Sequence, residues 1–278
     1  MNAKVRLAQG LVALGCSLVT AGAAAQTFAP FGVDPGTDRY ESTQNFALEL
    51  RGGPFYPDTD SEFGGRATPL ADMFGTSSRV QFGLEFDWQA LRLGAAGSLG
   101  VGLGAGYTSM SAVAPITQSP MPSDPAQWQR PSGGQETTLR VFPTYGVLVY
   151  RFDTLARRTL IPLVPYAKLG LSYSIWWVTN GDETARRTLA LSPGAAAGDP
   201  DLDQDAIGGS LGTHLALGLM LRLDVFERRA QRSWDLGMGV NHSYLFAEYL
   251  RSDPGSLGSR AQMRLGVSTW NVGLAMEF

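Results

Sequence analysis

Apolar and polar residues alternate along several segments of this chain, and a period of two predicts β-strands. The alternation is clearest at the C-terminus, where every second residue is apolar over the last nine positions: Trp270, Val272, Leu274, Met276 and Phe278. The residues between them are small or polar and include Glu277. This segment therefore predicts a strand with one fully apolar face.

Seven further segments show the same alternation: 46–51, 80–89, 91–107, 139–149, 166–177, 210–223 and 238–250. In 80–89 the polar positions carry Glu85 and Asp87, and in 91–107 one face is almost bare because it consists mainly of glycine. Pro143 weakens the fourth segment, and the facing of 238–250 is the hardest to assign. Apolar residues outside and polar residues inside are the arrangement of a membrane barrel.

The linkers between these segments alternate in length. Short linkers lie near 89–92, 153–161 and 224–234, and long ones near 54–78, 111–134, 180–207 and 251–263. This alternation predicts an all-β fold, a transmembrane antiparallel up-and-down β-barrel of eight strands with long extracellular loops and short periplasmic turns. An even number of strands places both termini in the periplasm. A hairpin hidden in a long loop, for instance around 186–191, would raise the count to ten.

The N-terminus has the order of a secretory signal peptide, with Lys4 and Arg6, an apolar run and then three alanines before Gln26. We therefore expect a signal peptide at 1–25, cleaved between Ala25 and Gln26, a periplasmic arm at 26–43 and the barrel at 44–278. Lipidation at Cys16 is the alternative, but Ala13-Leu14-Gly15 before it does not form a leucine-led lipobox.

Composition narrows the class of protein further. Cleavage removes the only cysteine, which excludes disulfides and a thiolate nucleophile in the mature chain. It also removes two bases and no acid, so the formal charge moves from -3 to -5. An acidic chain lacks the basic surface that binds nucleic acid.

Beyond Gln26 no apolar run approaches the roughly 18 residues of a membrane helix, so a membrane-spanning mature chain must be a closed barrel.

The C-terminal pattern, an aromatic last residue after alternating apolar positions, resembles the assembly signal of outer-membrane β-barrel proteins. The strand count resembles the small OmpA- and OmpX-type barrels, and 150–153 and 241–244 resemble segments of uncharacterised members of that superfamily. The resemblance implies the cell outer membrane of a Gram-negative bacterium. The implied partners are outer-membrane lipid, lipopolysaccharide and the barrel-assembly machinery. It implies no activity and no cofactor, and the ligand of the loops stays unknown.

Eight strands leave an interior that side chains just fill, so inward charges need partners. The candidates for this lumen polar network are Glu49, Arg51, Glu85, Asp87, Arg140, Lys168, His214 and Arg222. We interpret them as a structural network of ion pairs and hydrogen bonds. The alternative is an ion or proton path gated by such a pair.

Aromatic residues near the predicted strand ends suit the girdles that anchor barrels at membrane interfaces. They are Trp88, Tyr107, Tyr173, Trp177 and Trp270. Stacking against sugars is the alternative role for these rings.

Two further sites can be drawn from residue types alone. His242, Ser243 and Glu248 supply the groups of the barrel lipases that deacylate lipid A, but neighbouring strand residues point to opposite faces, so we predict no enzyme. The acidic run from Asp199 to Asp205 could bind calcium, but Ala206 replaces the required glycine and no glutamate closes the loop. A solvated acidic loop is the simpler interpretation.

These observations favour an integral outer-membrane protein without enzymatic activity, a scaffold whose extracellular loops carry specificity. A narrow, porin-like channel is the second hypothesis and a lipid-modifying enzyme the third. A soluble barrel of lipocalin type is the fourth, and it would bury its apolar faces inward.

Overall fold

The computed structural model describes residues 46–116, 124–159, 161–181, 183–188, 203–223, 240–258 and 262–278. These residues belong to one unit, Glu41–Phe278. The expected signal peptide and periplasmic arm lie outside the described residues. No helix in the described ranges has the length and apolar character needed to cross a membrane.

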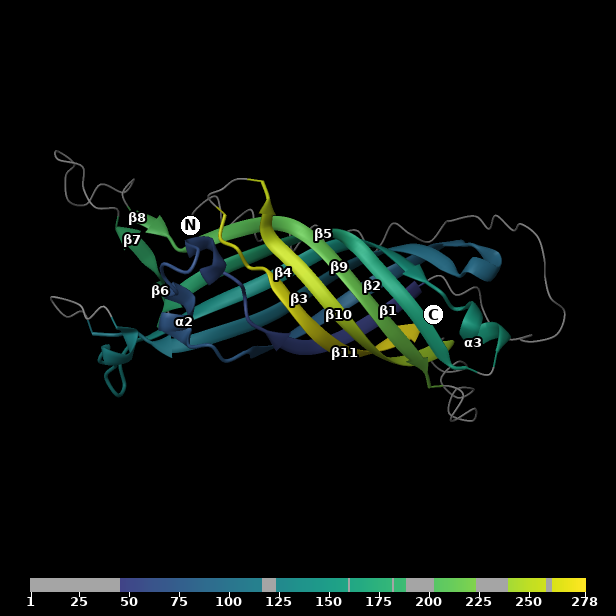
Figure 1. Cartoon of the computed structure of the whole chain (residues 1–278), viewed down its shortest axis with the longest axis horizontal. Helices are drawn as coiled ribbons and strands as arrows, with labels where there is room; N and C mark the ends of the chain where they lie inside the picture. The colour runs from purple at the N-terminus through teal and green to yellow at the C-terminus, as the bar shows by residue number, and fades with distance from the viewer. Residues whose placement is uncertain are drawn as a thin grey trace. The chain divides into compact units, whose positions relative to one another are not determined.

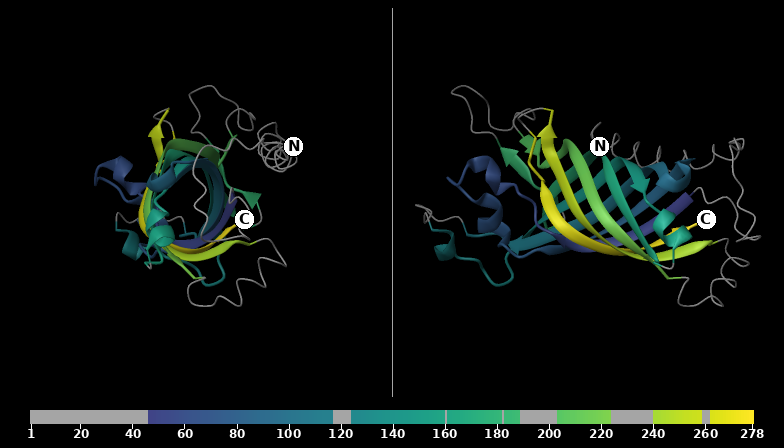
Figure 2. Two further views of the ribbon diagram at one scale, coloured as in Figure 1. Left: turned by 90° about the vertical axis from the view of Figure 1, so that its right-hand side faces the viewer. Right: turned by 45° about the vertical axis from the view of Figure 1, so that its right-hand side comes forward.

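Eight antiparallel strands close into a barrel (Figures 1 and 2). They are β1 (Phe46–Phe55), β2 (Arg79–Arg92), β3 (Ser98–Val113), β4 (Glu136–Arg151), β5 (Leu163–Asn180), β9 (Ile207–Arg222), β10 (His242–Leu257) and β11 (Val267–Glu277). Each strand pairs with its neighbour in the chain, β5 pairs with β9, and β1 closes the ring with β11. The predicted class, an all-β antiparallel up-and-down barrel of eight strands, is confirmed.

The last strand pairs with the first, as an up-and-down barrel requires. Leu50 lies opposite Leu274, and Phe46 and Phe278 exchange backbone hydrogen bonds at one end of the barrel. The C-terminal residue therefore sits at the barrel rim, next to the first described strand.

The connections differ between the two ends of the barrel. At one end, here called the loop end, lie 56–78, 114–135, 181–206 and 258–266; at the other, the turn end, lie 93–97, 152–162 and 223–241. The last of these is longer than the short turn expected near 224–234, because β10 begins only at His242. Residues 224–239 lie outside the described residues.

The third loop contains a hairpin of the kind that the sequence analysis gave as an alternative around 186–191. Strand β6 (Glu183–Thr184) pairs antiparallel with the end of β5, and β7 (Arg186–Thr188) pairs with β8 (Asp203–Asp205) in a separate two-stranded sheet. Because the β7–β8 pair does not join the ring of eight, the wall keeps eight strands rather than ten.

Burial alternates along each strand and fixes which residues face the lumen. Large apolar side chains on the outer face are exposed, for example Leu103 at 70% and Phe82 at 63%, whereas Glu49, Asp87 and Lys168 are fully buried inside. Burial of charge and exposure of apolar surface reverse the order of a soluble barrel and match that of a membrane barrel. The lipocalin alternative, with apolar faces inward, does not describe this barrel.

One facing prediction is wrong. On β4 the apolar residues Leu139 and Val141 point into the lumen, so Arg140 lies on the outer face, where its Nη1 donates to Thr179 Oγ1 at 2.6 Å. The reason is that the loop end of the lumen has an apolar filling, described below. Apolar residues on this strand therefore do not mark the lipid face.

The glycines of the inner face make room for aromatic rings. A Cβ on Gly104 of β3 would overlap the ring of Tyr145 on β4, and a Cβ on Gly218 of β9 would overlap the ring of Tyr166 on β5. Each ring therefore lies flat over the backbone of the neighbouring strand, which allows a narrow barrel to hold aromatic side chains.

We predict that Gly104→Ala destabilises the barrel by about 1–3 kcal/mol, because the rigid ring of Tyr145 must move. Gly146→Ala on the outer face is the matched control, since the nearest atom to its new Cβ is Leu103 Cδ2 at 3.5 Å. Urea unfolding of the refolded barrel in lipid vesicles measures both. Equal effects of the two substitutions would contradict this packing.

Candidate functional site

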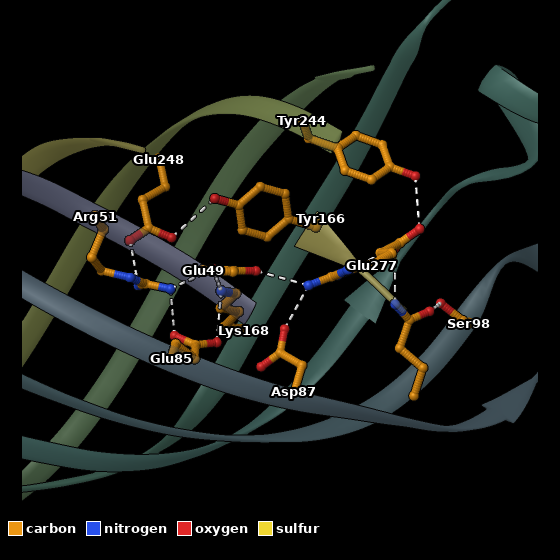
Figure 3. Close-up of polar contacts among 12 residues, drawn as sticks. Glu49, Arg51, Glu85, Asp87, Ser98, Tyr166, Lys168, Tyr244, Glu248 and Glu277 are labelled. Atoms are coloured by element: carbon orange, nitrogen blue, oxygen red, sulfur yellow. Dashed lines mark hydrogen bonds and ion pairs between the residues drawn. The ribbon is translucent and has the colours of Figure 1, made fainter. Parts of the chain in front are cut away.

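The centre of the lumen is organised around the guanidinium of Arg51 on β1 (Figure 3). Its Nη1 donates to Glu248 Oε1 on β10 at 2.6 Å, and its Nη2 donates to Glu49 Oε2 at 2.5 Å and to Glu85 on β2. One planar cation therefore joins three carboxylates from three strands, a task that suits the several fixed donors of arginine.

Lys168 forms ion pairs that cross the full width of the barrel. It stands on β5, four strands from β1 in either direction around the ring, and its Nζ donates to Glu49 Oε2 at 2.6 Å and to Glu85 Oε1 at 2.7 Å. Glu49 and Lys168 have no exposed surface. Opposite walls are thus held together by an ion pair that water does not reach.

Arg151 extends the network toward the turn end. From the last position of β4, its Nη2 donates to Glu49 Oε1 at 2.8 Å and Asp87 Oδ2 at 2.6 Å, and its Nη1 donates to Glu277 Oε1 at 2.9 Å. Glu277 is the penultimate residue of the chain. The strand that carries the expected assembly signal is therefore tied through its inner face to β4.

Neutral donors complete the carboxylate shells. The tyrosine hydroxyls each donate to one carboxylate: Tyr145 to Glu85 at 2.8 Å, Tyr166 to Glu248 at 3.0 Å and Tyr244 to Glu277 at 2.9 Å. Gln89 Nε2 also donates to Glu277 Oε1 at 2.9 Å. Donors of this kind lower the cost of burying these carboxylates, while Nε of Arg51 and Nε of Arg151 have no partner in the described structure.

The network carries more acid than base. Glu49, Glu85, Asp87, Glu248 and Glu277 face the three cations described above, and Asp87 Oδ1 is buried without a hydrogen-bond partner in the described structure. Within the described residues, Glu49, Glu85 and Asp87 are the group whose oxygens lie close enough together to hold a metal ion. The Lys168 ammonium already contacts two of these three carboxylates, so the residues do not favour an added metal.

The loop end of the lumen is closed by an apolar cap. We use this name for Phe55, Leu70, Met110, Leu139, Val141, Leu265 and Val267, all buried against one another. Leu70 belongs to the short helix α2 (Pro69–Phe74), whose first amides, those of Leu70 and Ala71, donate to the Asp60 carboxylate. At the other end of α2, Arg130 from the second loop donates to Asp72 O at 2.7 Å and to Val113 O at 2.6 Å. These contacts hold the first loop over the barrel mouth.

A small cavity of about 30 Å³ lies between the cap and the network. His214 lines it, stacked on Tyr145 with ring centroids 4.1 Å apart, and neither ring nitrogen has a partner in the described structure. Arg51, Ser252 and Asn271 also line the cavity. Its size suits one or two water molecules and excludes a larger ligand.

Among the inward candidates from the sequence, the structure brings Glu49, Arg51, Glu85, Asp87 and Lys168 into one network. His214 lies beside the network, in the cavity wall. Arg222 lies apart at the turn end, with Nη2 2.9 Å from His242 Nδ1, and Arg140 faces outward.

The sequence analysis missed Arg151, Glu277, Glu248 and the three tyrosines. Period two places Glu277 on the inner face of β11, so this residue could have been found. Arg151 and Glu248 required the facing of β4 and β10, which their mixed composition hides.

The predicted girdle residues all point outward. Trp88 lies toward the turn end, paired with Phe46, while Tyr107, Tyr173, Trp177 and Trp270 lie in the halves of their strands nearer the loop end. Trp177 is half-buried, and the other four are exposed, from 42% for Tyr173 to 63% for Trp270. Four of these five aromatic residues thus lie on the loop-end side of the apolar surface, and Trp88 lies on its turn-end side.

The remaining residue groups do not assemble. On β10, His242 and Glu248 point inward and Ser243 outward, with Glu248 engaged by Arg51 and Tyr166, so no hydrolytic triad converges among these described residues. In the acidic run, Asp203 and Asp205 form the ends of β8, while Asp199 and Asp201 lie outside the described residues.

Comparison with known proteins gives distant structural likenesses. No protein-family model and no curated protein matches the chain. OprG, an outer membrane protein from Pseudomonas aeruginosa, has a TM-score of 0.45 at 13% identity, covering 86% of this chain and 97% of that one. Ail, the attachment invasion locus protein of Yersinia pestis, in complex with the heparin analogue sucrose octasulfate, has a TM-score of 0.36 at 9% identity, covering 84% and 97%. A major outer membrane protein from Thermus thermophilus has a TM-score of 0.33 at 12% identity, covering 84% and 99%.

We predict that Glu49→Gln costs about 3 kcal/mol or more of unfolding free energy, because it leaves Arg51, Lys168 and Arg151 short of a shared buried partner. Asp87→Asn is the matched control. It removes one acid from a network with an excess of acid, and one of its oxygens has no partner, so we expect a loss below about 1 kcal/mol.

Urea unfolding in lipid vesicles compares the unfolding free energies of the two variants. The slope of the unfolding free energy against urea concentration should be unchanged in both. If Asp87→Asn were the more damaging, the partner assignment in this network would be wrong.

Proposed function

We propose that this protein is an integral outer-membrane barrel that serves as a scaffold with a closed lumen. Its loop end lies at the cell surface and carries the binding specificity of the protein. The expected signal peptide at 1–25 and the aromatic C-terminal residue support export and insertion as the route to that membrane. No enzymatic step forms part of the proposal.

Membrane insertion is supported by the outer surface. Exposed leucine, valine and phenylalanine side chains cover the middle of the strands, and a soluble protein rarely exposes so large a contiguous apolar surface. Aromatic residues bound this surface toward both ends, as in barrels that span bilayers. Closure of the ring also leaves no unpaired strand edge for the lipid to desolvate.

The observation that carries the scaffold proposal is the burial of the charged network, whose centre has no exposed surface. Glu49, Asp87, Lys168 and Glu248 each have 0% exposure although they come from four strands around the barrel. An ion that crossed the lumen would have to break these contacts, and the apolar cap would oppose its entry from the loop end.

The structure of the loop end supports a role in presenting a binding surface rather than in passing solutes through the lumen. Arg130, Asp60 and the short helix α2 fix the first and second loops to each other, so their surface is held in one arrangement. Rigid scaffolds with ordered loops are the usual platforms for binding partners. The chemistry of such a partner is not specified by any described residue.

A narrow channel is the second candidate, favoured by one observation. The cavity below the cap lies next to a network with an excess of carboxylates, and rings of acid select cations in channels. Conduction would then require displacement of both the cap and the Arg51 contacts.

We expect the purified protein to give no stepwise currents in planar bilayers, because the network and the cap close the lumen. The Glu85→Gln variant should also give no currents, since Lys168 and Arg51 keep Glu49 as a partner. A general porin recorded in parallel serves as the positive control. Reproducible conductance steps in the wild-type protein, altered by Glu85→Gln, would favour the channel.

We also expect the protein to fractionate with outer membranes and to migrate faster on gels before boiling than after it, as folded barrels resist detergent. The measurement is immunoblotting of membrane and periplasmic fractions. Recovery in the soluble periplasm would overturn the membrane proposal.

A further inference from the structure

The outer face of the barrel wall contains very few charged residues. Within the described strands of the wall, away from their first and last residues, two bases point outward, Arg140 on β4 and Arg251 on β10. Two acids share this face near the loop end: Glu136, the first residue of β4, and Asp253, which lies 3.6 Å from Arg264. A base on a lipid-facing surface is costly unless its charge meets water or an anion.

Arg251 is the better placed of the two bases. Its side chain is exposed, and it makes no hydrogen bond or ion pair with the described part of the chain. Arg140, in contrast, is partly buried and donates to Thr179. Across the sheet Arg251 faces Ser268 on β11 and Leu215 on β9, neither of which can neutralise it.

An aromatic pair lies directly below Arg251 on the same face. Tyr249 is the previous outward residue of β10, and it packs edge-on against Trp270 of β11 with ring centroids 5.4 Å apart. The two rings are 40% and 63% exposed; Leu217 of β9 lies opposite Tyr249, and Val272 continues the apolar surface toward the turn end. Aromatic rings of this kind mark the depth at which acyl chains give way to headgroups.

The position of Arg251 therefore determines what it can meet. One step beyond the aromatic level, its guanidinium reaches the headgroup layer of the leaflet at the loop end. The strongest acceptors in that layer are phosphate oxygens, which guanidinium groups bind with two parallel hydrogen bonds.

We propose that Arg251, Tyr249 and Trp270 form a binding site for a phosphate-bearing lipid of the leaflet at the loop end. The rings contact the top of the acyl chains, and Arg251 binds the headgroup phosphate. The site rests on the proposed membrane insertion, and it adds a specific lipid contact to it.

Native mass spectrometry of the full mature protein in detergent, titrated with diphosphoryl lipid A, tests the site. We expect Arg251→Gln to weaken lipid binding about fivefold, the effect of one base near an anionic surface. The matched control is Arg92→Gln, because Arg92 lies at the opposite end of the barrel and is paired with Asp153 at 2.9 Å. It should bind lipid A as the wild type does.

Two further arms identify the source of the phosphate. Added salt should weaken the binding of the wild type more than that of Arg251→Gln. Excess inorganic phosphate should not displace the lipid, because it lacks the acyl chains that contact the rings.

The outcomes separate this site from the membrane proposal. Equal lipid A binding by wild type, Arg251→Gln and Arg92→Gln overturns the site while heat-modifiable mobility still supports the barrel in its membrane. Displacement by inorganic phosphate overturns the lipid assignment. Failure of all three proteins to migrate as folded barrels, with recovery in the soluble fraction, would instead overturn membrane insertion.

Discussion

The constraint on which the rest of this barrel depends is the burial of charge in a narrow lumen that side chains largely fill. Lys168 and Arg151 each meet Glu49 across the lumen, and Arg51 meets Glu248 two strands away, so these contacts set the distance between strands that are not neighbours. The glycines follow from the same constraint, since Tyr145 and Tyr166 reach their carboxylates only by lying over Gly104 and Gly218. Replacement of the network by open water would need a wider ring with more strands.

The two ends of the lumen solve the packing problem differently. Toward the turn end, the charged and hydroxyl groups share the interior with a second apolar cluster, formed by Val164, Tyr166, Met220, Tyr244, Phe246 and Ala275. Toward the loop end the apolar cap fills the interior and draws on the first and last loops. This division explains why β4 carries apolar side chains on its inner face near Leu139 and Arg151 at its other end. The outer surface also changes along the barrel. It is apolar along the middle of the strands, and Arg251 lies beyond the aromatic residues that border this apolar surface.

Much of this architecture could be predicted from sequence, because an alternation with period two fixes the strands and, where one face is strictly apolar, their facing. The terminal strand and its partner at Phe46–Arg51 are such cases, and so are Glu85 and Asp87 on β2. Period two fails where both faces are mixed. On β4 it placed Arg140 inside, and on β10 it grouped Glu248 with His242 and Ser243 rather than with the lumen network. Contacts across the lumen, such as Lys168 with Glu49, depend on strands far apart in sequence, which a local pattern cannot supply.

The most direct test of this account is the coupling between Arg51 and Glu248, which lie 197 residues apart in sequence and 2.6 Å apart in the lumen. A double-mutant cycle with Arg51→Met and Glu248→Gln, measured by urea unfolding in lipid vesicles, isolates their interaction. We predict a coupling free energy of about 1.5 kcal/mol or more, typical of close buried charge pairs. A coupling near zero would contradict a lumen held together by its charged network.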